Sequence, residues 1–103
     1  MGPPPGWQNP IVVQPGQTQR SVDPLRLLPS RQDLIKLRIE FQRGLILAGK
    51  QRYSLIQVTE DGVIYDGHHG VRAAAEEQVN VDVLIVAVKL QPMAASVLQL
   101  PVR

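Results

Sequence analysis

The chain has 103 residues, enough for one hydrophobic core, and 44% of them are hydrophobic while 19% are charged. This composition excludes a disordered charged tail, and the absence of cysteine excludes disulfides, zinc–thiolate sites and thiol catalysis. The net charge of +2 is slight, there is no signal-peptide pattern, and the apolar run at residues 81–88 is too short for the ~20 residues of a membrane-spanning helix. We therefore expect a folded cytoplasmic domain that does not engage a membrane.

Residues 1–20 are rich in proline and glycine and have no regular period, which is typical of a linker-like segment. We expect a single domain over residues 21–103. Within the first segment, residues 11–13 (IVV) predict a short strand, and Trp7 is expected to pack against the domain. Residues 21–30 (SVDPLRLLPS) predict an extended edge segment, because their prolines cannot donate to a sheet.

A first helix is expected over about residues 31–43. Ser30 and Asp33 have the spacing of a capping box, and Gly44 is typical of a helix end. The apolar residues at helical spacing are Leu34, Leu37 and Phe41. This stripe predicts a helix face that packs into the core.

Much of the positive charge falls in one short stretch. It comprises Lys36, Arg38, Arg43, Lys50 and Arg52. The cluster is either a patch for phosphates or the solvated side of a helix and the loop after it. In the first interpretation, Arg43, Lys50 and Arg52 would follow a nucleic-acid backbone. Glu76 and Glu77, further along the chain, are expected to be solvated.

The second half of the chain predicts a hairpin, a helix and a buried strand. Residues 53–58 and 63–65 are apolar and rich in strand-forming types, and Asp61-Gly62 between them is typical of a tight turn. The alanine-rich residues 67–78 predict a helix, and residues 81–88 predict a central strand. The segment "MAASVL" predicts one or two further helical turns. This order of elements indicates a small α+β domain, with helices packed against a mixed sheet.

Polar residues gather where the second helix is expected to begin, in the segment "DGHHGVRAA" at residues 66–74. The first backbone N–H groups of a helix have no partner within the helix and carry partial positive charge, so this end attracts anions. Asp66 stands at the expected N-cap position. Gly67 and Gly70 leave room for a phosphate beside the backbone, and Arg72 is close enough in sequence to donate to it. We therefore predict a phosphate-binding site.

The adjacent His68 and His69 admit three roles in this site. Either can act as a general base or acid beside Asp66, donate to a phosphate oxygen, or pack without any chemistry. Because adjacent helical residues point about 100° apart, we expect one ring to face the pocket and the other to pack or be solvated. A metal site is not expected, because these three residues lie too close in sequence to converge on one ion.

The segment "VIYDGHHGVRAA" resembles the signature of the ParB/sulfiredoxin superfamily, in which a strand ends in a glycine turn, followed by polar residues and then by an arginine and alanines on a helix. The segment "SVDPLRLLPS" is similar to one that often precedes the signature, and the resemblance covers about two thirds of the chain. It implies that Gly67 matches the family's glycine, that His68 and His69 occupy the polar pair, and that Arg72 matches the later arginine. Gly70 departs from the pattern, because the family usually has a base there.

Proteins of this superfamily are described as ParB-like nucleases, as domains that hold a nucleoside triphosphate at this helix, or as sulfiredoxins. The absence of cysteine rules out sulfiredoxin chemistry. The first hypothesis is a ParB-like nuclease domain in which His68 or His69 assists phosphodiester hydrolysis. The second is a non-catalytic nucleotide-binding or regulatory module that engages a partner protein. A third is a toxin or effector domain of a larger, exported protein. The sequence does not identify a cofactor, for which a nucleotide and a divalent metal ion are the two candidates.

Overall fold

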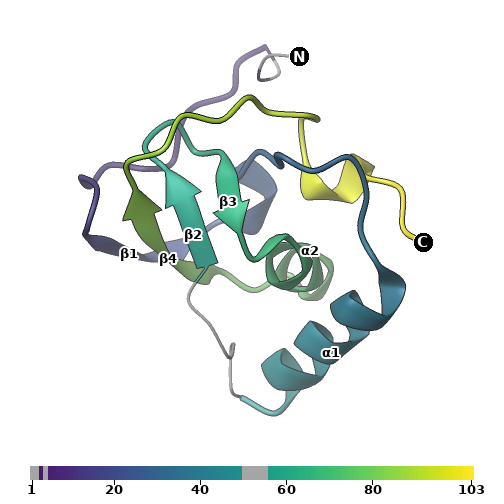
Figure 1. The fold of residues 1–103 in the computed structure, drawn as a ribbon. Helices are drawn as coiled ribbons and strands as arrows, with labels where there is room; N and C mark the ends of the chain where they lie inside the picture. Colours follow the sequence, from purple (N-terminus) through teal and green to yellow (C-terminus); the bar gives the residue numbers. More distant parts are fainter. Residues whose placement is uncertain (1–2, 4, 50–55) are drawn as a thin grey trace.

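A four-stranded mixed sheet in the order β1-β4-β2-β3 forms one layer of the molecule (Figure 1). The computed structural model describes residues 3, 5–49 and 56–103. The strands are β1 (Thr18–Val22), β2 (Ile56–Thr59), β3 (Ile64–Asp66) and β4 (Val81–Val86). β4 pairs antiparallel with β1 and parallel with β2, while β2 and β3 form an antiparallel hairpin. The sheet is therefore mixed, as expected.

Two α-helices and two 3-10 helices complete the described fold. They are α1 (Lys36–Leu47), α2 (His68–Glu77), η1 (Pro24–Arg26) and η2 (Val97–Gln99). In Figure 1, α2 lies beside the sheet, and α1 packs against the opposite side of α2. The domain is a small α+β fold with its helices packed together with the sheet, which confirms the predicted fold class.

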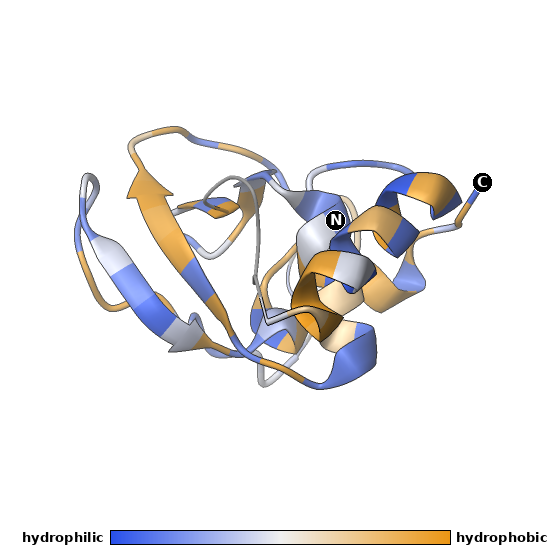
Figure 2. Cartoon of the chain, turned by 90° about the horizontal axis from the view of Figure 1, so that it is seen from below, coloured by the Kyte–Doolittle hydropathy of each residue, from blue (hydrophilic) through white to orange (hydrophobic). Residues whose placement is uncertain are grey.

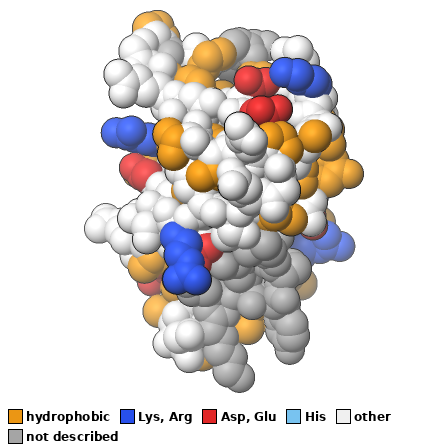
Figure 3. All heavy atoms as spheres, turned by 90° about the vertical axis from the view of Figure 1, so that its left-hand side faces the viewer, with side chains coloured by type: hydrophobic (Ala, Val, Ile, Leu, Met, Phe, Trp, Pro, Cys, Tyr) orange, Lys and Arg blue, Asp and Glu red, His pale blue; other side chains and the backbone are white. Residues whose placement is uncertain are grey.

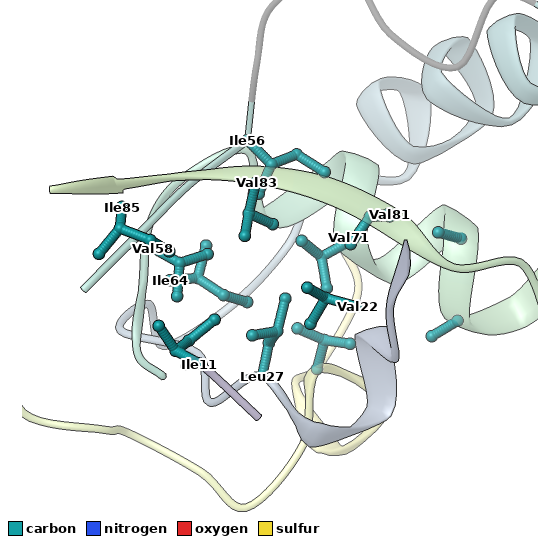
Figure 4. Close-up of a cluster of buried hydrophobic side chains, with 13 residues drawn as sticks. Ile11, Val22, Leu27, Ile56, Val58, Ile64, Val71, Val81, Val83 and Ile85 are labelled. Carbon is teal, nitrogen blue, oxygen red and sulfur yellow. The ribbon is translucent and has the colours of Figure 1, made fainter. Parts of the chain in front are cut away.

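The main hydrophobic core lies between the sheet, α2 and the segments around η1 and η2 (Figure 4). Alternate residues of β4 supply one wall, because side chains in a strand point to opposite faces in turn. Val83 and Ile85 face Val71 of α2 and Leu27, and all four are at most 1% exposed. Figure 2 shows the hydrophobic β4 beside the polar edge strand β1. On the β1 side of the molecule, charged side chains of both signs lie among hydrophobic ones (Figure 3).

The N-terminal segment packs on the domain without forming the strand predicted at residues 11–13. Ile11 joins the core, while the Trp7 indole N–H donates to the Arg26 carbonyl at 2.8 Å. The Gln19 side chain bonds the Val12 N–H and the Pro10 carbonyl, so it replaces a partner strand there. The edge strand forms instead at residues 18–22, and the domain boundary expected after residue 20 falls inside it.

The first helix begins five residues later than predicted. Leu34 is fully buried and extended, because its N–H donates to the Pro101 carbonyl at 2.9 Å and its carbonyl accepts from the Arg103 N–H at 2.8 Å. The predicted capping box does not form, since the Ser30 hydroxyl donates to the Ile64 carbonyl at 2.6 Å. Gly44 lies inside α1, which continues to Leu47.

The apolar stripe predicted to pack into the core is mostly exposed. Leu37 is 81% exposed and Phe41 is 55% exposed, while Ile39 is the fully buried residue of α1. α1 packs against α2 through a different face from the one that the stripe predicts, since Ile39 and Ile46 cluster with Ala73 of α2. Leu37 and Phe41 are left beside a pocket.

The predictions for the second half of the chain are largely confirmed. The hairpin turns at Asp61 and Gly62, and the alanine-rich helix and the β4 strand form within a few residues of their expected bounds. Residues 53–55 of the predicted hairpin lie outside the described residues. Within the described ranges, the helices are too short or too polar to span a lipid bilayer.

Candidate functional site

A pocket of about 610 Å³ opens between α1, the end of β3 and the first turn of α2. Its lining comes from residues 30 and 31, from one face of α1, from Ile56 of β2 and from residues 65–70. Its size lies within the range of ~300 to ~1,000 Å³ that is usual for small-molecule sites. Every candidate residue from Asp66 to Gly70 therefore lines the same pocket.

Gly67 starts α2 through its backbone conformation. It is the N-cap residue with a φ of 97°, in the left-handed region that favours glycine. A Cβ built on Gly67 would lie 3.0 Å from Cγ1 of Ile56 and 3.3 Å from its Cα, so β2 also leaves no room for a side chain. The expectation that Asp66 caps this helix is wrong, because Gly67 occupies the N-cap position and no side chain bonds there.

The first turn of α2 leaves its backbone donors available at the pocket wall. The first amide that bonds within the helix is that of Val71, which donates to the Gly67 carbonyl at 3.0 Å. In the described part of the chain, the N–H groups of His68, His69 and Gly70 have no such partner. These donors, together with the helix dipole, favour a negatively charged ligand.

His68 holds the segment before α1 in place. Its Nε2 accepts a hydrogen bond from the Ser30 N–H at 2.9 Å. Because a backbone N–H can only donate, the proton of the neutral ring must sit on Nδ1. His68 is 4% exposed. Burial lowers the pKa of His68 to about 4, with further contributions from the positive charges of Arg31 and His69.

His69, the next residue, makes the same kind of contact with the backbone just before α1. Its Nε2 accepts from the Ile35 N–H at 3.1 Å, at the residue where α1 begins. Burial lowers the pKa of His69, and the charges of Arg31 and Arg38 lower it further. Both rings are buried, both line the pocket and both accept from backbone, so the expected division, with one ring facing the pocket and the other packed or solvated, is not seen.

Arg72 faces away from the pocket, contrary to its expected place behind the helix start. Its Nη1 donates to the carbonyls of Val97 and Leu100 at 3.0 and 3.3 Å, and its Nε donates to Glu76 at 2.6 Å. The side chain therefore joins α2 to η2 and is not among the residues that line the pocket. A residue five positions after the N-cap points to another side of the helix, which explains the placement.

Arg43 also bonds side chains of the protein itself. Its guanidinium bonds the carboxylates of Glu76 and Glu77, the latter at 2.6 Å, and lies 3.6 Å from Glu40. These contacts join α1 to α2, so Glu76 and Glu77 are not simply solvated as expected. Burial opposes ionisation of Glu76, but hydrogen bonds from Arg43 and Arg72 outweigh it and lower its pKa. Lys50 and Arg52, the other two predicted nucleic-acid contacts, lie outside the described residues.

The described residues contain no cluster of three side chains suited to hold a metal ion. Comparisons with protein-family models, with curated proteins and with solved structures found no match. The resemblance to the ParB/sulfiredoxin superfamily therefore stays a prediction from the sequence.

Eight residues that line the pocket are not among the site residues predicted from the sequence. They are Ser30, Arg31, Leu37, Arg38, Phe41, Gln42, Ile56 and Tyr65. The sequence indicates Arg38 only as one member of the basic cluster, and it predicts that Phe41 packs into the core. The helical spacing could have indicated their common position. Arg38 and Gln42 lie four residues apart, as do Leu37 and Phe41, so each pair lies on one side of the helix. Two adjacent rows on one helix face therefore place both polar and apolar side chains in the pocket.

Proposed function

We propose that this protein is a nucleotide-binding module that holds its ligand without hydrolysing it. The phosphates would lie at the first turn of α2, and the base and sugar would lie against the exposed apolar side chains of α1 and β3. A regulatory role through a partner protein follows if ligand binding alters this exposed face. The cytoplasm, where nucleotides are abundant, is the compartment that fits this proposal.

One observation supports this proposal above the others. The pocket combines unpaired backbone donors at a helix N-terminus with two arginines, and it has aromatic rings on its rim. Arg38 is exposed and forms no ion pair with any described residue, so its charge is available to a ligand. Arg31 lies 3.9 Å from Asp33, in a partly exposed pair that costs little to rearrange. Phosphate groups are well matched to such paired guanidinium and backbone donors.

The hydrogen bonds of the two histidines favour a binding module over a nuclease. A general base needs a free lone pair, but each Nε2 already accepts from a backbone N–H. The low pKa of His68, about 4, also means that this ring does not carry the extra proton of a general acid at neutral pH. Each Nδ1 remains a donor, which suits hydrogen bonding to an anion. Only the sequence resemblance to the ParB/sulfiredoxin superfamily still supports the nuclease hypothesis.

The decisive experiment is calorimetric titration with ATP, CTP, GTP and UTP, using Arg38→Ala and Lys36→Ala as a matched pair. Both variants remove one exposed positive charge from α1, but only Arg38 lines the pocket. We expect saturable binding to the native protein, with affinity falling about 10- to 100-fold in Arg38→Ala and hardly at all in Lys36→Ala.

Turnover is measured in the same samples. Nucleotides and short DNA or RNA strands are incubated with and without Mg²⁺ or Mn²⁺, and the products are separated by chromatography. Intact ligand after saturable binding supports a module. Cleavage of the strands would favour the nuclease hypothesis instead. A failure of all four nucleotides to bind at millimolar concentration would reject the proposal.

A further inference from the structure

Two kinds of side chain line the pocket. Arg31 and Arg38 lie near His69, close enough for their charges to lower its pKa. Gln42 lies beside Gly70, where a built Cβ would lie 3.2 Å from Oε1 of Gln42 and 3.9 Å from Cδ1 of Ile56. The two arginines therefore suit phosphate, while Gln42 offers a single amide close to an apolar side chain.

Two aromatic rings also line the pocket. Phe41 of α1 is 55% exposed and Tyr65 of β3 is 48% exposed, and both line the pocket. Large apolar side chains that remain exposed beside a cavity are typical of ligand-binding surfaces. Flat rings offer stacking surfaces for a nucleobase, and such stacking is tolerant of base identity because every base has a π-face. Stacking alone would therefore not select among bases.

Gln42 is the polar group that can make the selection. It is half-buried, it lines the pocket, and its amide has no hydrogen-bond partner among the described residues. A primary amide offers both a donor and an acceptor, and leaving these unused in a half-buried position is unfavourable. The absence of a side chain at Gly70 gives the amide its place beside the first turn of α2.

We propose that Gln42 determines base specificity by pairing its amide with the hydrogen-bonding edge of a nucleobase, which rests on the nucleotide-binding function proposed above. Adenine and cytosine present an amino donor beside a ring-nitrogen acceptor. Guanine and uracil present a carbonyl acceptor beside a ring N–H donor. In the structure, Oε1 of Gln42 lies toward Gly70, and an amide kept in this orientation matches one of these two patterns and opposes the other.

The test compares Gln42→Leu with Gln91→Leu, which makes the same substitution at an exposed position outside the pocket. Leucine keeps the volume and the apolar character of the pocket wall but removes both hydrogen-bonding groups. Each protein is titrated with the four nucleoside triphosphates and with inorganic triphosphate, and thermal melting checks that each is folded. Inorganic triphosphate reports the contribution of the phosphates without a base or sugar.

We expect the native protein and Gln91→Leu to prefer either the adenine and cytosine nucleotides or the guanine and uracil nucleotides by about tenfold. Gln42→Leu should bind all four with similar affinity and should bind inorganic triphosphate as the native protein does. A preference that survives in Gln42→Leu, or four equal affinities in the native protein, would overturn the role of Gln42 alone. Failure of every nucleotide to bind would overturn the proposed function together with it.

Discussion

Nε2 of His68 accepts a hydrogen bond from the Ser30 N–H at 2.9 Å, and this contact joins α2 to a segment 38 residues earlier in the chain. His69 repeats the contact at Ile35, so two adjacent histidines fasten both ends of residues 30–35. Arg31 lies between these two anchors and lines the pocket. The histidine pair therefore positions part of the candidate site through the backbone.

Replacing His68 with alanine should lower stability. The change leaves the part-buried Ser30 N–H without its partner and opens a cavity at the buried ring, so we expect the free energy of unfolding to fall by about 2 to 4 kcal/mol. His68→Gln should lose less, because its side-chain oxygen can reach the former position of Nε2. Urea unfolding followed by circular dichroism measures both variants. Equal stability of the native protein and His68→Ala would contradict the anchoring role.

Stability should also fall as the pH drops below neutrality. The pKa of His68 is lowered to about 4 in the folded protein. In the unfolded chain it is about 6.5, so the unfolded state binds the proton more readily in the window between these values. The free energy of unfolding is therefore highest above about pH 6.5 and should decline by up to about 1.4 kcal/mol per pH unit below it.

His69 acts in the same direction, since its pKa is also lowered. Urea unfolding at pH 7, 6 and 5 measures the slope before most carboxylates titrate. The double variant His68→Gln, His69→Gln is the control, and its stability should change much less over this range. A slope that is the same in the double variant and the native protein would show that these rings do not govern the pH response.

Arg43→Ala should loosen α1 from α2 without affecting the pocket. The guanidinium bonds Glu76 and Glu77 across the two helices, but it does not line the pocket. We expect a loss of about 1 kcal/mol that shrinks in 1 M salt, because these pairs are partly exposed. Arg20→Ala on the exposed edge of β1 is the control for removal of one charge. Arg43→Ala should bind nucleotides normally, and impaired binding would instead support a direct role in the site.

Local sequence patterns were sufficient to predict the elements in the second half of the fold. The Asp61-Gly62 turn, the alanine-rich helix and the β4 strand each depend on residues that are close in sequence. The start of α1 was mispredicted because it depends on distant partners. Leu34 is held extended by residues 101–103, and Ile35 is held by His69. No local pattern in residues 30–35 reports these contacts.

The candidate site was predicted in part for the same reason. The glycine turn and the two histidines are contiguous in sequence, so the pattern at residues 66–70 identified one wall of the pocket. The partners of Arg72 are carbonyls of Val97 and Leu100, which a sequence motif cannot show. Arg38 and Gln42 come to the opposite wall only because α1 packs beside α2.

Gly67→Ala and Gly44→Ala should have opposite effects on stability. Gly67 has a φ of 97° and its Cβ would press on Ile56, so alanine there should cost about 1 to 3 kcal/mol. Gly44 lies inside α1 with open space around a built Cβ, so alanine should raise stability by about 0.5 to 1 kcal/mol. Thermal melting measures both. A harmless Gly67→Ala would argue against the glycine-dependent start of α2.

Asp66 lines the pocket with a negative charge, which opposes an anionic ligand unless a cation accompanies it. In metal-free buffer, Asp66→Asn should therefore bind nucleoside triphosphates about two- to fivefold more tightly than the native protein. Added Mg²⁺ should strengthen binding to the native protein more than binding to the variant, because a carboxylate can contact the hydrated ion that the phosphates carry.

Glu60→Gln is the matched control for Asp66→Asn, since it removes an exposed carboxylate outside the pocket. Calorimetric titrations with and without Mg²⁺ give four affinities for each protein pair. If Asp66→Asn and Glu60→Gln behave alike in both buffers, Asp66 does not face the phosphates. The phosphates would then bind the two arginines and the first turn of α2 without approaching the end of β3.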